Sequence, residues 1–316
     1  MSQTILENDK SYPSNKELLD EFHSHGVITL EDYISETRVD EILEEIQTVT
    51  DKAQQDLIND WNNQKICFYS VQKHHKKSPD EDFANKPYFL ESKDKSHIFY
   101  EKIANTYQIN RIGHALHKET NYPGLGSLIN DKMIQFLKAL NYLRPVCHLS
   151  VYIPKYGFGL GSKVKPHQEN TFAYSEPTSA LVLWIALEDA TIENACLWGI
   201  PGSNHWPLKY ISKLDSHRKQ RTFYQINDVE IPNFETEIER YKPLEVKKGS
   251  ALIMHGNFVH ASPANFSSKS RQSISLQFLE TANTHYPNFN WIWPGRTDYL
   301  YDLTNDINQE FEYVNL

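Results

Sequence analysis

From Pro145 onward the chain is a series of short apolar runs with alternating polarity, and this pattern limits the folds open to it. Turn residues such as those at 201–203 and 248–249 separate the runs. Many short strands divided by turn signals favour a β-sandwich or barrel. We therefore predict a mostly β fold with flanking helices and a double-stranded β-helix (jelly roll, cupin-like) core over 145–280. Its expected strands cover residues 147–154, 180–187, 196–200, 250–254 and 273–280.

Residues 1–144 have a mainly helical pattern instead. Ser35 is a suitable N-cap for a helix over 36–58, where apolar residues recur at helical spacing. The polar stretch 203–240 predicts a long, irregular insertion between strands. No linker or internal repeat divides the sequence, so we expect one domain over 1–316. Further helices are expected over 16–23 and near 133–140, with short strands at 27–30, 67–70 and 97–100.

Composition excludes several classes of protein. Hydrophobic residues make up 39% of the 316 residues and aromatic residues 12%, which is typical of a globular chain. The net charge of -9 argues against a nucleic-acid partner. The sequence has no run of 18 apolar residues, so we expect no membrane span. The polar N-terminal stretch shows no export signal. Three scattered cysteines form no disulfide framework, so we expect a reducing, cytoplasmic location.

The residues most indicative of chemistry are His167, Glu169 and His260. Residues two apart on a strand point to one face, so His167 and Glu169 can reach the same ion. With a distant histidine they match the 2-His-1-carboxylate triad of non-haem Fe(II) enzymes. Three ligands leave three positions of an octahedral ion open, enough for a chelating 2-oxo acid and O2. Arg271, eleven positions after His260, is placed to hold the carboxylate of that acid.

Other histidines offer alternative sites. The chain has 14 histidines, so an H-x-E pair alone has little weight. The pairs His74-His75 and His114/His117 are also possible ligands in principle, although surface roles or roles supporting a site are expected for them. No carboxylate accompanies His255. The glycine-rich loop 157–161 lacks the following helix of a phosphate cradle and is interpreted as a loop near the entrance.

Several blocks in order resemble the phytanoyl-CoA dioxygenase family of Fe(II)/2-oxoglutarate oxygenases, in particular its domain-containing protein 1 branch. The resemblance extends over roughly residues 88–280 and is much more specific than the H-x-E pair. It implies a double-stranded β-helix and 2-oxoglutarate-dependent oxygenation. The blocks are FLESKDK (89–95), INRIGHALH (109–117), VYIPK (151–155), PHQENTFAYSEP (166–177), LWIALEDATIENACLWGIPGS (183–203) and MHGNFVHASPANFSSKSRQ (254–272).

The resemblance also implies roles for individual residues. The family's metal ligands, two His and one Asp, fall on His167, His260 and Glu169. Its cosubstrate-binding residues fall on Arg271, which pairs with the distal carboxylate, and on Ser262, Trp184 and Arg111. Two of these positions depart from the family. Glu169 replaces Asp and extends the carboxylate by one methylene. Arg111 replaces Lys, which keeps the charge but changes a point donor into a planar fork.

We therefore expect an enzyme, an Fe(II)/2-oxoglutarate-dependent dioxygenase that hydroxylates a small-molecule or acyl substrate and releases succinate and CO2. Its partners would be that substrate, which the sequence does not identify, and O2. The alternative is a catalytically impaired protein that binds metal and 2-oxoglutarate, because Glu169 replaces the usual Asp. Retention of Arg271, Ser262 and Trp184 favours the active enzyme, since a dead site has no need of a cosubstrate pocket.

Overall fold

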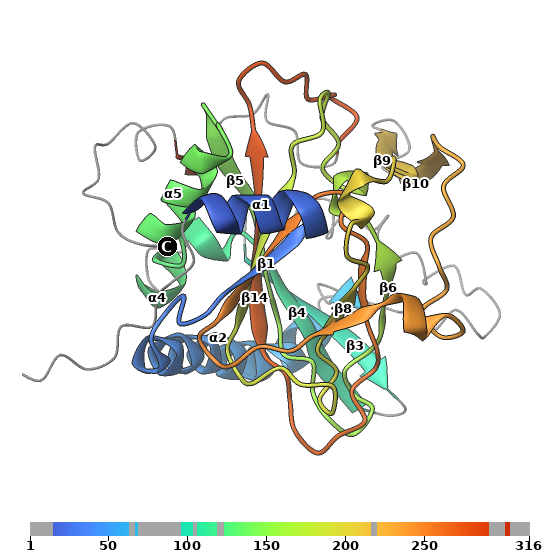
Figure 1. Cartoon of the computed structure of the whole chain (residues 1–316). Helices are drawn as coiled ribbons and strands as arrows, with labels where there is room; N and C mark the ends of the chain where they lie inside the picture. Colours follow the sequence, from blue (N-terminus) through green and yellow to red (C-terminus); the bar gives the residue numbers. More distant parts are fainter. Residues whose placement is uncertain are drawn as a thin grey trace, which may run out of the picture.

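Two β-sheets form the frame of the protein (Figure 1). The computed structural model describes residues 15–62, 67–68, 96–103, 106–118, 123–215, 220–290 and 301–303. In this part of the chain the large sheet has nine strands, with the path β1-β12-β7-β14-β5-β4-β3-β2 and β15 paired with β5. These are β1 (Val27–Leu30), β2 (Cys67–Phe68), β3 (His97–Ile103), β4 (Thr106–His114), β5 (Pro145–Ile153), β7 (Leu181–Ala186), β12 (Ala251–His255), β14 (Ser273–Glu280) and β15 (Tyr301–Asp302).

The small sheet has four strands in the order β11-β8-β13-β6, all antiparallel. Together the two sheets give the mostly β, jelly-roll fold expected from the sequence, and the runs after Pro145 form strands. One strand was not among those expected. The strand that begins at Ala251 stops at His255, and His260 begins a separate strand. The small sheet comprises β6 (Val164–His167), β8 (Leu197–Gly199), β11 (Lys242–Leu244) and β13 (His260–Ser262).

Strand β7 shows why its sequence is apolar throughout. All six of its residues are buried. Leu181, Leu183 and Ile185 pack against the helices, whereas Val182 and Trp184 pack against residues of the small sheet. A strand covered on both faces shows no polar alternation. The helices on the outer face are α1 (Asn15–His25), α2 (Glu36–Asn62), α4 (Pro123–Gly126) and α5 (Asp131–Ala139).

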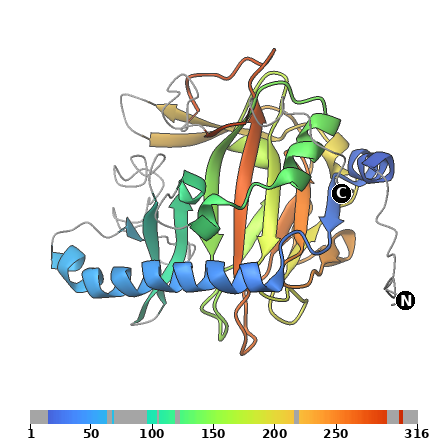
Figure 2. The same ribbon diagram turned by 90° about the vertical axis from the view of Figure 1, so that its left-hand side faces the viewer.

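Helix α2 lies across the strands of the large sheet, and α1 and α5 cover another part of the same core (Figures 1 and 2). Ser35 is the N-cap predicted from the sequence, since its Oγ accepts a hydrogen bond from the backbone N–H of Arg38. The N-terminal part is less helical than expected. Strands β3 and β4 extend the large sheet well beyond the predicted short strand at 97–100.

The stretch 203–240 is not irregular throughout. It contains the antiparallel hairpin of β9 (Tyr210–Asp215) and β10 (Gln220–Gln225), in which Ile211 and Ser212 are buried and residues 222–225 are exposed, so the sequence shows no simple alternation. This hairpin lies beside residues 169–171, where Phe172 and Phe223 make an edge-to-face contact at 6.0 Å. Short 3-10 turns complete the fold: η3 (Leu116–Lys118), η4 (Glu169–Thr171), η5 (Ser203–His205) and η6 (Ile238–Arg240).

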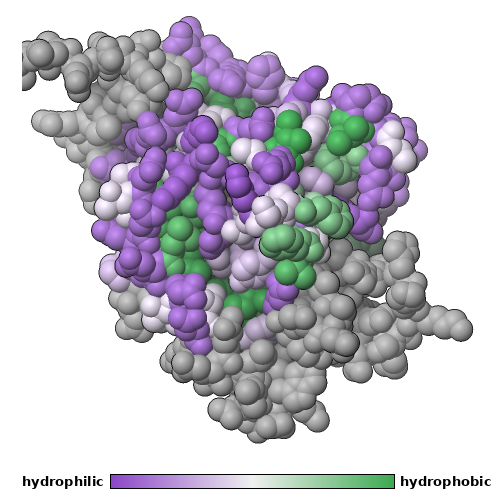
Figure 3. All heavy atoms as spheres, turned by 90° about the horizontal axis from the view of Figure 1, so that it is seen from below, coloured by the Kyte–Doolittle hydropathy of each residue, from purple (hydrophilic) through white to green (hydrophobic). Residues whose placement is uncertain are grey.

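The surface and the cysteines of the described residues show no unusual feature. On the face seen in Figure 3, hydrophobic side chains lie in separate patches among hydrophilic ones, as is common in folded proteins. Among the described residues, no helix has the length and apolar character needed to cross a bilayer. Cys147 and Cys196 are free and buried.

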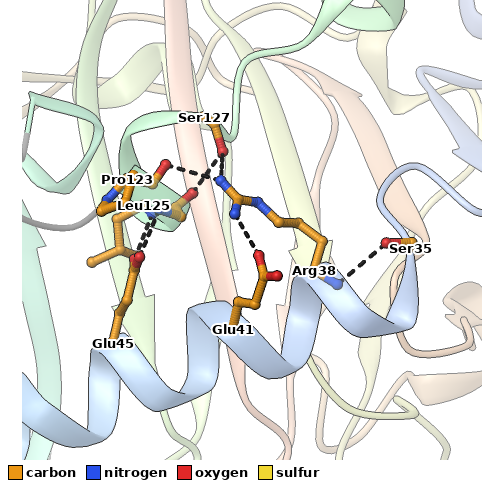
Figure 4. Close-up of polar contacts among 8 residues, drawn as sticks. Ser35, Arg38, Glu41, Glu45, Pro123, Leu125 and Ser127 are labelled. Carbon is orange, nitrogen blue, oxygen red and sulfur yellow. Dashed lines mark hydrogen bonds and ion pairs between the residues drawn. The ribbon is translucent and has the colours of Figure 1, made fainter.

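Polar contacts fix α4 onto α2 (Figure 4). The Glu45 carboxylate accepts hydrogen bonds from the backbone N–H groups of Gly124 and Leu125 at 2.7 and 2.9 Å. Arg38 donates to the carbonyl of Pro123 at 3.0 Å and to the hydroxyl of Ser127. The first amides of a helix have no acceptor within it, so Glu45 supplies one from a neighbouring helix.

We expect Glu45→Ala to lower the free energy of unfolding by about 1–2 kcal/mol, because two amides of α4 lose a charged acceptor. Glu44→Ala is the matched control, since Glu44 is an exposed glutamate on the same helix. Urea unfolding followed by circular dichroism measures both variants. Equal losses in the two variants would show that the contact with α4 contributes nothing specific.

Candidate metal centre

His167 and His260 lie directly opposite each other on neighbouring strands. In the pairing of β6 with β13, His260 is the register partner of His167. Their ring centroids are 4.3 Å apart, with an angle of 53° between the rings. Antiparallel partners project to the same side of a sheet, so the backbone pairing alone brings the two imidazoles together.

Glu169 completes the cluster from the turn that follows β6. The strand ends at His167 and Glu169 begins a 3-10 turn, so the expectation that both lie on one strand was wrong. Gln168 is nevertheless extended, which keeps the two flanking side chains on one side. Glu169 Oε1 lies 3.3 Å from Nε2 of His167 and 3.5 Å from Nε2 of His260.

Backbone contacts hold this turn in place. Gln168 is buried and donates to the carbonyls of Pro207 and Asn257, while its own side-chain oxygen accepts from the backbone of Lys209. Asn170 donates to Asn257 and accepts from the backbone N–H of Ala180. The residues on both sides of Glu169 are therefore anchored, which limits the positions open to its carboxylate.

The Nδ1 atoms of the two histidines make hydrogen bonds to backbone carbonyls. Nδ1 of His167 lies 2.8 Å from the carbonyl of Lys165, and Nδ1 of His260 lies 3.1 Å from that of Phe258. A carbonyl can only accept, so each Nδ1 carries its proton and donates. Each Nε2 then faces Glu169. Partners of this kind fix the orientation of metal-binding imidazoles.

Charge is unevenly distributed over the three groups. Burial favours the neutral form of Glu169, but hydrogen bonds from His167 and His260 outweigh it and hold the pKa of its carboxyl well below the ordinary range. Burial also opposes charge on His167, yet the hydrogen bond and negative charge of Glu169 raise its pKa. Burial and the charge of His167 together lower the pKa of His260. The negative charge of Glu169 therefore favours protonation of His167 over protonation of His260.

The cluster fits a metal ion. The three candidate ligand atoms lie within 4.8 Å of one another. Metal–ligand bonds of about 2.1 Å place neighbouring ligands of an octahedral ion about 3 Å apart, close to the spacings around Glu169. Among the described residues this is the only group of three or more His, Cys, Asp or Glu with such spacing.

The other candidate histidines do not make such a group. Burial lowers the pKa of His117 to about 3, and its Nδ1 contacts the hydroxyl of Ser150 at 2.8 Å. His114 is buried beside the ring of Phe99. His255 accepts from the backbone N–H of Asn257 through Nδ1. The pair His74-His75 lies outside the described residues.

Two polar residues near the cluster were not singled out from the sequence. Gln277, on β14, donates from Nε2 to Oε2 of Glu169 at 2.7 Å. His148, on β5, contacts the carbonyl of Gln277 through Nδ1 at 3.1 Å, and burial lowers the pKa of His148 to about 4. No motif marks either residue, because their role follows only from strand pairing.

Arg271 is buried beside Trp184 rather than exposed at the surface. It is 1% exposed, and its guanidinium lies over the ring of Trp184, 5.1 Å from the centroid. Among the described residues its Nε has no hydrogen-bond partner, and one terminal nitrogen lies 3.4 Å from Ser273 Oγ. Burial lowers its pKa to about 10, so it stays charged at neutral pH. A buried cation with an unused donor is arranged for an anionic ligand.

Ser262 lies beside a second buried cation, Lys155. Lys155 belongs to the VYIPK segment (151–155), but the sequence analysis gave it no role. Lys155 is 3% exposed, and its ammonium donates to Ser262 Oγ at 2.8 Å and to the carbonyl of Ser162 at 2.9 Å. The backbone carbonyl of Lys155 also accepts from the N–H of Arg271. An ammonium only donates, so the Ser262 hydroxyl accepts from it and keeps its own proton free to donate.

Arg111 and Lys155 line a small hollow that also includes Tyr156, Ser162 and Val164. Arg111 is half-buried on β4 and donates from Nε to Asn110 at 2.9 Å. Its charge acts on His167, which places it on the same side of the molecule as the cluster. The hollow therefore combines two cations beside the candidate metal ligands.

Comparison with known proteins gives the family. The model of the phytanoyl-CoA dioxygenase (PhyH) family matches residues 22–273. A phytanoyl-CoA dioxygenase of Arabidopsis thaliana is 34% identical over 289 residues, covering 87% of this chain and 92% of the relative. A phytanoyl-CoA dioxygenase domain-containing protein 1 of Mus musculus is 36% identical over 220 residues, covering 66% of this chain and 73% of the relative.

Solved structures agree on the fold. AviO1 from Streptomyces viridochromogenes superposes with a TM-score of 0.54 at 15% identity, covering 86% of this chain and 98% of that one. The non-heme alpha ketoglutarate dependent epimerase SnoN superposes with a TM-score of 0.51 at 15% identity, covering 86% and 85%. The chain therefore belongs to the phytanoyl-CoA dioxygenase family and is an enzyme of the 2-oxoglutarate-dependent dioxygenase class.

Proposed function

We propose that this protein is an Fe(II)/2-oxoglutarate-dependent hydroxylase in which His167, Glu169 and His260 hold the iron. The observation that carries the proposal is the spacing of the three side chains, with both Nδ1 protons bound to the backbone and both Nε2 atoms facing one carboxylate oxygen. Two imidazoles and a carboxylate on one side of an ion are the donor set typical of non-haem Fe(II) oxygenases.

The metal supplies the redox chemistry when bound, so that the substrate C–H, 2-oxoglutarate and O2 give the substrate C–OH, succinate and CO2. The protein's own residues bind and orient the reactants. Glu169 brings negative charge to the site, and any proton on Nε2 of His167 must leave before that nitrogen can bind an ion. Phe172 contacts the ring of His167 and in turn contacts Phe223 of the hairpin, and these two rings offer an apolar wall to a small-molecule or acyl substrate.

We expect His260→Ala to weaken binding of Fe(II), or of Co(II) as a surrogate, by about tenfold or more, since one of three ligands is lost. His285→Ala is the control, because the described contacts of His285 are made by its backbone at a bridge with Glu176. Anaerobic titration with metal analysis of the dialysed protein measures both. Unchanged metal affinity in His260→Ala would remove the iron site from these residues.

The cosubstrate site is proposed on the cations beside the cluster. The distal carboxylate of 2-oxoglutarate would pair with Arg271, whose Nε is buried without a partner. Ser262 would donate its free proton to the same carboxylate, with Lys155 holding the hydroxyl in that orientation. The ring of Trp184 packs against the Arg271 guanidinium in a cation–π contact. Arg111 lines a hollow together with Lys155 and is the candidate for a further contact.

We expect Arg271→Leu to raise the Kd for 2-oxoglutarate by about tenfold or more, because a charge-assisted bidentate pair is worth about 1.5–3 kcal/mol. Isothermal titration of the Co(II)-loaded protein under anaerobic conditions gives the value. Arg240→Leu is the control, as Arg240 makes only an exposed ion pair with Glu237. If Arg271→Leu binds 2-oxoglutarate as tightly as the parent, the carboxylate site lies elsewhere and Arg111 becomes the next candidate.

Turnover decides between an active hydroxylase and the impaired alternative. We expect Fe(II)-dependent release of succinate from 2-oxoglutarate, since the carboxylate, both imidazoles and the buried cations are all in place. Screening small organic acids and acyl thioesters for stimulated succinate release would identify the substrate class. Tight binding of metal and 2-oxoglutarate without succinate above the metal-free blank, with every compound tested, would favour the impaired protein.

A further inference from the structure

The carboxylate of Glu169 uses its two oxygens differently. Oε1 faces both imidazoles at 3.3 and 3.5 Å, whereas Oε2 accepts a hydrogen bond from Gln277 at 2.7 Å. The Glu169 side chain is 12% exposed and Gln277 is 8% exposed, so this contact is shielded from water. The amide nitrogen must face the carboxylate, because an amide oxygen there would meet like charge.

Gln277 is itself fixed by an irregularity of the large sheet. Along β14, Gln277 pairs with Leu149 and the next residue, Phe278, pairs with Cys147. His148 is therefore the extra residue of a bulge in β5, and its Nδ1 contacts the Gln277 carbonyl at 3.1 Å. Bulges redirect side chains and are common beside active sites. Here the bulge holds the residue that contacts Glu169.

The length of Glu169 makes this contact important. A carboxylate can bind a metal through one oxygen or through both. Binding through both would fill a fourth position of an octahedral ion and leave two, which is too few for a chelating 2-oxo acid and a separate O2. A longer side chain is freer to turn both oxygens toward the ion. A hydrogen bond that occupies Oε2 works against that turn.

We propose that Gln277 is a positioning residue that keeps Glu169 a one-oxygen ligand and so preserves the position needed by O2. The inference rests on the proposed iron site and deepens it. It assigns a function to a glutamine whose described contacts are with Glu169 and His148. It also accounts for a glutamate at a position where the family has aspartate, since the extra methylene is matched by a partner for the second oxygen.

The test compares Gln277→Met with the parent. Methionine keeps the length and volume of glutamine but has no N–H to donate. Gln272→Met is the matched control. Gln272 lies five residues earlier on the same segment and donates to Glu188 at 3.0 Å, so the control removes a glutamine–glutamate hydrogen bond away from the cluster. Gln277→Asn, whose amide is one methylene shorter, serves if the methionine variant does not fold.

The first readout is the crystal structure of each protein loaded with Co(II), without cosubstrate. We expect one Glu169 oxygen on the metal in the parent and in Gln272→Met, and both oxygens in Gln277→Met. The second readout is nitric oxide, used as a stand-in for O2, added anaerobically to the Fe(II) protein with 2-oxoglutarate. We expect Gln277→Met to bind it about tenfold or more weakly, the scale of losing one hydrogen bond to a charged group.

A double-mutant cycle tests whether Gln277 acts through Glu169. In a Glu169→Asp background the shorter carboxylate no longer reaches Gln277, so Gln277→Met should change nitric oxide affinity less than about twofold. One-oxygen coordination and parental nitric oxide affinity in Gln277→Met would overturn the inference. A parent that holds Co(II) at Glu169 but binds no 2-oxoglutarate would overturn the proposed function alone, because the Co(II) structures still test Gln277. A parent without Co(II) there would overturn both.

Discussion

The pairing of β6 with β13 is the interaction on which the candidate site depends. It sets His167 opposite His260 through backbone pairing alone, independently of any side-chain contact. The small sheet can hold this register because β8 lies on the other side of β13, with His260 paired to Gly199. A Cβ at Gly199 would approach the ring of Phe258 to 2.2 Å, and that ring stacks at 11° to the imidazole of His260. The absence of a side chain at one position therefore helps to orient a ligand on the next strand.

The fold was largely predictable because its strands obey simple patterns. Runs such as 181–186 are apolar throughout since both faces of the large sheet are covered. Ser35 was identifiable as a cap because capping is local. The hairpin of β9 and β10 was missed because its buried residues, Ile211 and Ser212, are adjacent in sequence and residues 222–225 are exposed, so no hydrophobic period marks it. The second part of the large sheet, β3 and β4, was underestimated for a related reason, because its sequence is mixed and polar.

The residues of the candidate site also fall into those that the sequence indicates and those that only the fold reveals. His167, Glu169, His260 and Arg271 were recognisable from residue type, order and family resemblance. Lys155 and Gln277 were not, because each matters only through a contact across the fold, 107 and 108 residues away from its partner. Neither residue type is a metal ligand, and neither spacing is a motif. Residues that orient the ligands belong to strands whose pairing must be known first, and the bulge at His148 shows that even the strand register is not regular there.

Charge is distributed differently around the His–Glu–His cluster and around the buried cations Arg271 and Lys155. Glu169 is the acid that contacts both imidazoles, and it is held by a neutral amide rather than by a cation. The buried cations Arg271 and Lys155 lie instead around Ser262 and Trp184. In the proposed site, a ligand with two carboxylates would meet a metal-binding end and a cationic end, which would fix its direction. Had a lysine or arginine taken the place of Gln277, it would have withdrawn negative charge from the metal-binding end. A neutral donor orients Glu169 while leaving its charge available to an ion.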